Sequence, residues 1–121
     1  MNSFEDLEIY QMAFELALKL HKATLKLPQF ELYEQGGQSR RSSKGIKDTI
    51  AEGFGRRRYK SEFIRYLTFS HASCDEVRSQ LKMMIVLYPE IEEFPELLDS
   101  YKILGKKINK FIQYVENNWR T

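Results

Sequence analysis

The sequence predicts an all-α protein, an antiparallel up-down-up-down four-helix bundle, and three observations support this. Apolar residues recur at intervals of three and four over four long segments. Proline or glycine lies between these segments. No segment alternates apolar and polar residues as a half-buried strand does. The 121 residues suit one domain, residues 1–121, with helices expected at about 4–27, 32–53, 60–88 and 95–117.

The first expected helix carries two interleaved apolar rows. One row comprises Leu7, Tyr10, Phe14 and Ala17, and the other comprises Ile9, Ala13, Leu16, Leu20 and Leu27. Two rows make an apolar face wider than one bundle seam needs, so part of this face is suited to a subunit interface. Pro28 ends the helix because a proline disfavours helical geometry in the residue before it.

The second expected helix is a weak one. Its apolar residues are mainly Ile46 and Ile50, which share a face with small side chains, namely Ser39, Ser42 and Ser43. Small side chains on that face allow a neighbouring helix to approach closely. Gly36, Gly37 and Gly45 each cost about 1 kcal/mol of helix propensity relative to alanine, so packing must hold this helix in place.

The third and fourth expected helices have the clearest patterns. The third carries a seven-residue repeat made of Phe63, Leu67, Ser70, Cys74, Val77, Leu81, Met84 and Tyr88. Other apolar residues lie off this row, namely Ile64, Phe69, Ile85 and Leu87. The fourth continues the same spacing with Leu97, Tyr101, Leu104, Ile108, Phe111 and Val115. Pro89 ends the third helix, and Pro95 suits the first position of the fourth.

Charge is segregated along the chain, although the net charge of +2 is small. Residues 40–65 contain nine lysines and arginines against three acids, and residues 90–99 contain five acids and no base. The single cysteine excludes an internal disulfide, and the first 18 residues lack the basic region of a signal peptide. No uncharged run approaches the roughly 18–20 residues that span a bilayer. We therefore expect a soluble, cytoplasmic protein.

The stretch IAEGFGRRRYK, residues 50–60, joins the second expected helix to the third. Gly53 or Gly55 can adopt the left-handed conformation that closes a helix. Glu52 can form an ion pair with Arg56 or with Arg41 and so hold the turn in shape. Glu52, Gly53 and Gly55 are therefore predicted to form a structural turn.

Seven basic residues form the candidate nucleic-acid-binding site: Arg40, Lys44, Lys47, Arg56, Arg57, Arg58 and Lys60. The first three share one flank of a helix, and the other four cluster at its end, where cations also offset the helix dipole. The planar fork of arginine can hold a phosphate with two donors. The alternative is a solvated surface that balances its own charge. Phe54 and Tyr59 could stack on bases, or pack in the core or in an interface.

Three blocks of sequence resemble a bacterial family: FEDLEIYQMAFELA, QSRRSSKGIKDTIAEGFGR and SEFIRYLTFSHASCDEV. In this order they are similar to the four-helix-bundle family also called the intervening-sequence protein of 23S ribosomal RNA genes. The resemblance implies a left-handed bundle that assembles into a ring-like homopentamer. It also implies a relation to the accessory protein of diversity-generating retroelements, which is thought to bind RNA and a reverse transcriptase.

No pattern indicates catalysis, a cofactor or a metal site. His71 and Cys74 are three residues apart and could share a helix face as metal ligands, but Cys74 lies in the apolar repeat, which favours packing. We predict a non-enzymatic homo-oligomer, without a membrane partner, that binds structured RNA through the basic residues. The alternative is a protein-interaction scaffold with no direct nucleic-acid contact, and the salt dependence of binding separates the two.

Overall fold

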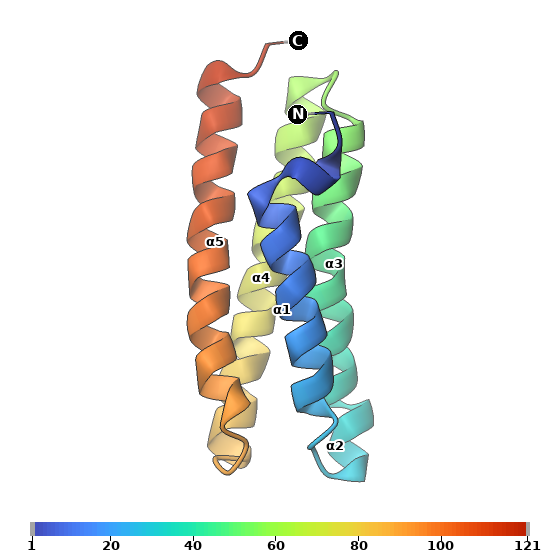
Figure 1. Cartoon of the computed structure of the whole chain (residues 1–121), viewed down its shortest axis with the longest axis vertical. Helices are drawn as coiled ribbons and strands as arrows, with labels where there is room; N and C mark the ends of the chain where they lie inside the picture. Colours follow the sequence, from blue (N-terminus) through green and yellow to red (C-terminus); the bar gives the residue numbers. More distant parts are fainter. Residues whose placement is uncertain (1, 121) are drawn as a thin grey trace.

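Four long helices lie side by side in this protein, as a computed structural model of residues 2–120 shows (Figure 1). They are α1 (Glu8–Thr24), α3 (Gln35–Gly55), α4 (Lys60–Leu87) and α5 (Glu93–Asn118). A short 3-10 helix, η1 (Phe4–Asp6), precedes α1, and a short helix, α2 (Gln29–Tyr33), precedes α3. Residues 2–120 contain no strand, so the prediction of an all-α four-helix bundle is confirmed. Within the same residues, no helix combines the length and apolar composition that crossing a membrane requires.

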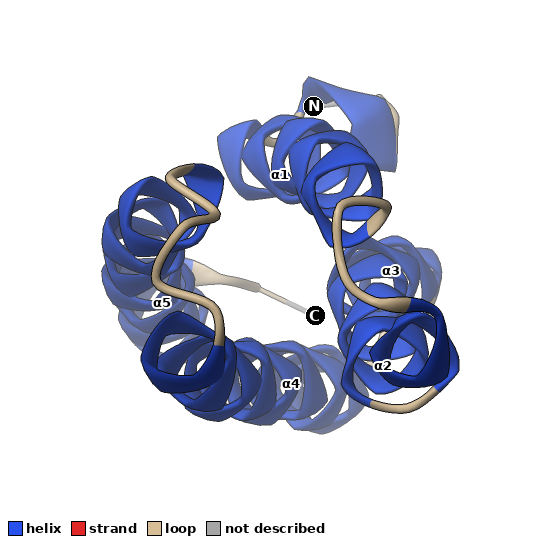
Figure 2. Cartoon of the chain, turned by 90° about the horizontal axis from the view of Figure 1, so that it is seen from below, coloured by secondary structure: helices blue, strands red, loops and turns tan. Residues whose placement is uncertain are grey.

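The helices follow one another round the bundle in the order α1, α3, α4, α5, so that α1 also meets α5 (Figure 2). Two ion pairs show how α1 and α5 are oriented. Glu8, at the start of α1, pairs with Lys107 in the second half of α5, whereas Lys26, just beyond α1, pairs with Glu93 at the start of α5. The two helices are therefore antiparallel.

The apolar repeats form a single core. In α4, seven of the eight residues of the expected repeat are buried, and Tyr88 is half-buried. In α5, Phe111 is the half-buried member of a row that is otherwise buried. In α1, the row that starts at Ile9 is buried throughout, whereas Phe14 of the other row is 45% exposed. The spacing of apolar residues therefore predicted the core, and the second row of α1 is in part an outer surface.

The helix ends differ from the prediction at four places, and the first is the end of α1 at Thr24, three residues before the expected end at Leu27. Extended geometry at Leu7 (φ −75°, ψ 128°) separates η1 from α1, so the first helix begins later than expected. A distorted backbone at Glu34 (φ −96°, ψ −94°) separates α2 from α3, and the second long helix begins at Gln35. α5 begins two residues before Pro95, which the first turn of a helix tolerates because no amide donor is needed there.

Small residues bring α3 and α4 into close contact. Ser70 Oγ lies 2.5 Å from Thr49 Oγ1 and 3.3 Å from the carbonyl oxygen of Ile46. A Cβ atom added at Gly53 would lie only 2.9 Å from Tyr66 Cβ. The lack of a side chain at Gly53 is therefore what lets the end of α3 lie against the start of α4.

Replacing Gly53 with alanine is expected to destabilise the protein by about 1–3 kcal/mol, because the added methyl group overlaps Tyr66. Gly45→Ala is the matched control, since no neighbouring atom lies within 4 Å of a Cβ there. Its better helix propensity predicts stabilisation by about 0.5–1 kcal/mol. Denaturant unfolding followed by circular dichroism measures both changes. Equal stabilities of the two variants would mean that α3 and α4 are not packed this closely.

Candidate nucleic-acid interface

The turn between α3 and α4 is a hydrogen-bonded unit at one end of the bundle (Figure 1). The amide of Arg56 donates to the carbonyl of Gly53 at 3.0 Å, and the amide of Tyr59 donates to the carbonyl of Arg56 at 2.9 Å. The carbonyl of Tyr59 accepts from the amide of Phe63, in the first turn of α4, at 3.0 Å. These bonds fix the backbone on both sides of the three successive arginines.

The prediction that a left-handed glycine closes α3 is wrong, because no glycine in residues 2–120 has a positive φ. Gly53 lies inside α3, where the contact with Tyr66 excludes a side chain. Gly55 is the last residue of α3, and its surroundings are open. The helix closes instead at Arg56, whose backbone has φ −102° and ψ 9°. Gly53 therefore allows close packing of α3 against α4 and does not supply an unusual backbone conformation.

Arg56 is held by two carboxylates, one of which is the expected partner Glu52. Its guanidinium lies 3.7 Å from the Glu52 carboxylate and 3.4 Å from that of Glu62. The ring of Tyr66 lies beneath it, 4.7 Å from guanidinium carbon to ring centroid. The side chain is still 47% exposed, so these are surface ion pairs that reduce the charge of Arg56 without removing it.

Arg57 is anchored against the end of the bundle. Its Nη1 atom donates to the carbonyl of Phe54 at 2.9 Å, and its guanidinium covers the Phe54 ring at 4.0 Å. Phe54 is 3% exposed, so it is a core residue and not a free stacking surface. The two remaining nitrogen atoms of the half-buried Arg57 side chain are not used in these contacts.

The end of α5 and the residues after it are bonded to this turn and to the start of α4. Trp119 Nε1 donates to the carbonyl of Arg57 at 3.2 Å, and Lys60 Nζ donates to the carbonyl of Glu116 at 2.6 Å. Arg120, which is exposed, follows directly after Trp119. No sequence signal pointed to Arg120, because about sixty residues separate it from the turn and only the antiparallel packing of α4 and α5 brings them together.

Arg58 and Tyr59 are both exposed, and they lie between α3 and α4. The Arg58 guanidinium is 5.8 Å from the centroid of the Tyr59 ring. Among residues 2–120, no carboxylate forms an ion pair with Arg58. Arg58 is therefore the arginine of this turn with the most available charge.

The three basic residues on α3 have different surroundings, although the sequence places them on one flank. Arg40 is turned inward: its guanidinium donates to Thr24 Oγ1 at 3.0 Å and to the carbonyl of Leu32 at 2.8 Å, and so links α1, α2 and α3. Lys47 forms an ion pair with the neighbouring Asp48 at 2.7 Å. Lys44 is exposed. The structure therefore does not bring these three side chains together as one cationic row.

Lys44 and Lys47 lie beside apolar side chains of α1. Together they line a shallow groove between α1 and α3 with Phe14, Ala17, Leu18 and His21. Lys47 Nζ is 6.0 Å from the centroid of the Phe14 ring. This second basic area is apolar at its base, unlike the end of the bundle.

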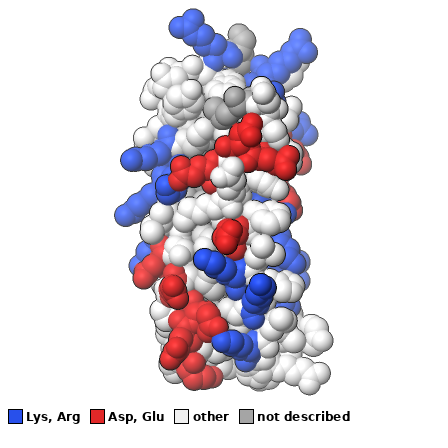
Figure 3. Space-filling view, in the orientation of Figure 1, with Lys and Arg blue, Asp and Glu red and all other residues white. Residues whose placement is uncertain are grey.

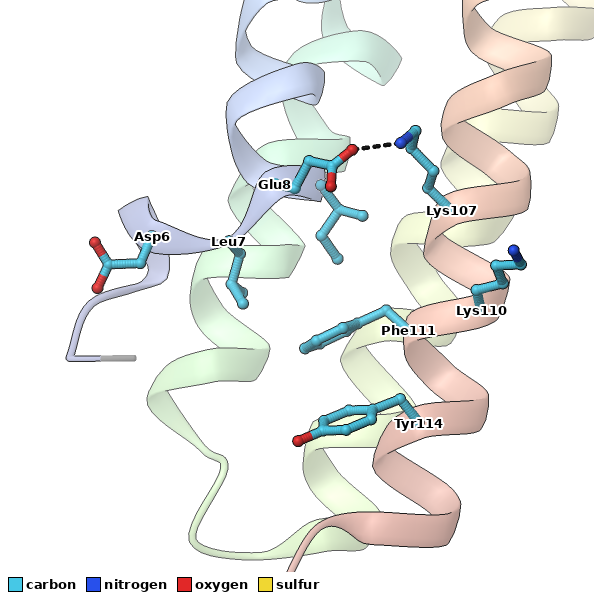
Figure 4. Close-up of a pocket in the computed structure, with 8 residues that line it drawn as sticks. Asp6, Leu7, Glu8, Lys107, Lys110, Phe111 and Tyr114 are labelled. Carbon is cyan, nitrogen blue, oxygen red and sulfur yellow. Dashed lines mark hydrogen bonds and ion pairs between the residues drawn. The ribbon is translucent and has the colours of Figure 1, made fainter.

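Another hollow lies between the start of α1 and α5 (Figure 4). Phe111 and Tyr114 stack along it, with ring centroids 5.9 Å apart, and the ion pair between Glu8 and Lys107 crosses it. Acids and bases balance here, and none of the predicted site residues lines it. This hollow does not have the electrostatic character of an anion site.

The surface charge differs between the two ends of the bundle (Figure 3). On the face shown, lysine and arginine side chains project from the end that carries the α3–α4 turn. Acidic side chains gather at the other end, near the connection from α4 to α5, where the sequence has five acids in residues 90–99. The two tips of the bundle therefore differ in charge, although acidic side chains also form a band across this face below the basic end.

His71 and Cys74 do not form a common site. Cys74 is fully buried, and its thiol donates to the carbonyl of Tyr101 at 3.2 Å. His71 lies 3.8 Å from the Asp75 carboxylate, on the side of α4 that faces α5. Across residues 2–120, no three His, Cys, Asp or Glu side chains are grouped as metal ligands are. Burial raises the pKa of the Cys74 thiol to about 12.

This raised pKa predicts a loss of stability in alkali. The contribution of Cys74 is fully present below the pKa of the unfolded thiol, about 8.5, and declines as the pH rises toward the folded-state value. Between about pH 8 and about pH 10, wild type should therefore lose about 1–2 kcal/mol more than Cys74→Ala. Urea unfolding at several pH values measures the difference. Parallel pH profiles of the two proteins would contradict the burial of the thiol.

Comparison with known proteins agrees with the resemblance seen in the sequence. The family described as 23S rRNA-intervening sequence protein matches residues 5–110, which include most of η1, α1 to α4, the turn between α3 and α4 and most of α5. No curated protein matches the chain. The chain belongs to the 23S rRNA-intervening sequence protein family.

Proposed function

We propose that this protein is a subunit of a homo-oligomer that binds structured RNA through the end of the bundle at the α3–α4 turn. We call this surface the cationic end, and it comprises Arg56, Arg57, Arg58, Lys60 and Arg120. The observation that carries the proposal is that hydrogen bonds from Trp119 and Lys60 join the end of α5, which Arg120 follows, to the turn that carries the three arginines. The family description refers to ribosomal RNA, and this favours RNA as the polyanion.

The cationic end suits phosphate contact because its charges remain partly available. Arg58 has no ion-pair partner among residues 2–120, and Lys60 uses one donor on a neutral carbonyl. Arg56 shares its charge with Glu52 and Glu62 and contributes less. Contacts of this kind bind nucleic acid without reading base sequence, and their strength falls steeply with salt because bound counterions are released.

The three basic residues on α3 enter the proposal differently. Lys44 and Lys47 are assigned to a second contact beside the groove between α1 and α3. Arg40 is assigned a structural role, since its donors are used by Thr24 and by the Leu32 carbonyl.

Self-association is supported by apolar side chains on the outer faces of two helices. On α1, Phe14 is 45% exposed and Leu18 is 51% exposed. On α4, Phe69, Met83 and Leu87 are between 42% and 51% exposed. A second copy would cover such surfaces. A homopentamer, the assembly that the family resemblance implies, would also repeat the cationic end and so strengthen its electrostatic field.

The double variant Arg56→Gln, Arg58→Gln tests this proposal. The slope of log Kd against log salt concentration for a structured RNA should become shallower by about 1–2 relative to wild type, because phosphate contacts are lost. The matched control is Lys102→Gln, Lys106→Gln, which removes the same charge from exposed positions on the middle of α5. The control should keep the wild-type slope. Fluorescence anisotropy titrations between about 50 and about 300 mM salt measure these slopes.

Three outcomes would contradict the proposal. Equal changes in both double variants would indicate a response to net charge alone. Absence of RNA binding by an oligomeric wild-type protein would favour the protein-interaction scaffold. A light-scattering mass of one 14.4-kDa chain at micromolar concentration would contradict the assembly.

A further inference from the structure

We propose that Tyr59 is a stacking platform for an unpaired nucleotide base, so that the cationic end selects single-stranded segments of RNA. This inference rests on the proposed function, because it specifies the form of RNA that the site accepts. It adds an aromatic contact to a surface that is otherwise described by charge alone.

Tyr59 is the exposed aromatic residue of the α3–α4 turn. Its side chain is 61% exposed, whereas Phe54 is 3% exposed beneath Arg57. The other strongly exposed aromatic residues, Phe30 at 67% and Tyr33 at 71%, lie on α2 at the opposite end of the bundle. Tyr59 is therefore an exposed aromatic ring next to a cluster of cations, whereas the exposed rings on α2 lie away from that cluster.

Hydrogen bonds hold the backbone of Tyr59 in place. Its amide donates to the carbonyl of Arg56 at 2.9 Å, and its carbonyl accepts from the amides of Glu62 and Phe63, both at 3.0 Å. A tyrosine on a fixed backbone has only two side-chain torsions to order when a ligand binds. The entropic cost of stacking a base on this ring is therefore small.

The neighbouring arginine leaves room for a base. The Arg57 guanidinium covers the Phe54 ring at 4.0 Å, whereas Arg58 lies 5.8 Å from the Tyr59 centroid. Arg58 thus lies over the Tyr59 ring at a longer distance than Arg57 over Phe54, without close contact. A base stacked on Tyr59 has the Arg58 guanidinium at hand for its flanking phosphate, and Lys60 is the next residue along the chain.

Carboxylates near this ring are already engaged. Glu62 pairs with Arg56 at 3.4 Å and with Arg65 at 3.5 Å, and Glu52 also pairs with Arg56. The anionic groups closest in sequence to Tyr59 are therefore held by other cations, and they do not offset the charge of Arg58.

Stacking on a protein ring requires a base that is free on at least one face. Bases inside a duplex are covered by their neighbours, whereas bases in loops, bulges and single strands can be splayed out. Stacking of this kind tolerates any base, because each one has a π-face. The cationic end should therefore prefer single strands and the unpaired parts of folded RNA, with little preference for sequence.

The variant Tyr59→Leu tests this inference against Tyr33→Leu, a matched control at the opposite end. With a labelled single-stranded oligoribonucleotide, Tyr59→Leu should weaken binding about tenfold while leaving the salt slope unchanged, because no charge is lost. A fully paired duplex of the same sequence should bind wild type and Tyr59→Leu equally. Tyr59→Trp should bind the single strand at least as tightly as wild type, and Tyr33→Leu should match wild type.

A second measurement does not depend on the folding of any variant. Irradiation of the wild-type protein with an oligonucleotide that contains 5-bromouridine should crosslink Tyr59, and peptide mass spectrometry locates the adduct. Suppose that wild type and Tyr59→Leu bind the single strand equally and with the same salt dependence, and that the crosslinks fall on other residues. This result overturns stacking on Tyr59 and leaves the proposed function in place. If the wild-type protein binds neither the single strand nor the duplex, both the stacking inference and the proposed function are overturned.

Discussion

Close packing of α3 against α4 is the constraint on which the rest of the structure depends. α3 buries only Ile46, Ile50 and Phe54 as large apolar residues, and its internal glycines oppose helix formation. Such a helix is stable only when it is packed against others. The missing side chain at Gly53 and the contact between Thr49 and Ser70 allow this packing. The end of α3 is thereby held against the start of α4, and the four residues 56–59 suffice to join them.

This geometry makes three successive arginines chemically different. Arg56 is paired with carboxylates, and Arg57 is anchored on the ring and carbonyl of Phe54. Arg58 is left beside an exposed tyrosine. The first two therefore also serve to hold the turn, whereas the third has its charge available to a ligand. The proposed RNA contact rests on this combination of a fixed backbone, an unpaired arginine and an exposed aromatic ring.

The core and the helices could be predicted from the sequence because apolar spacing is a local property. Several features of the site could not, because they depend on where distant segments lie. Arg40 is drawn inward by Thr24 and by a carbonyl of α2, a separate helix that the second apolar segment did not indicate. Arg120 reaches the turn only through the packing of α5. The close-packing role of Gly53 was also missed, because the sequence suggested a left-handed closing residue and the contact depends on where Tyr66 of α4 lies.

Hydrogen–deuterium exchange of the protein, with and without a single-stranded RNA oligonucleotide, tests the fixed turn and the RNA contact most directly. In the free protein, the amides of Arg56, Arg57 and Tyr59 should already exchange more slowly than amides of a turn without hydrogen bonds, because each of the three donates to a carbonyl. At saturating RNA, exchange should slow further over residues 55–61 and stay unchanged over residues 88–93 at the acidic end. Fast exchange of the Arg56, Arg57 and Tyr59 amides in the free protein, or RNA protection at the acidic end, would contradict this structure and its proposed site.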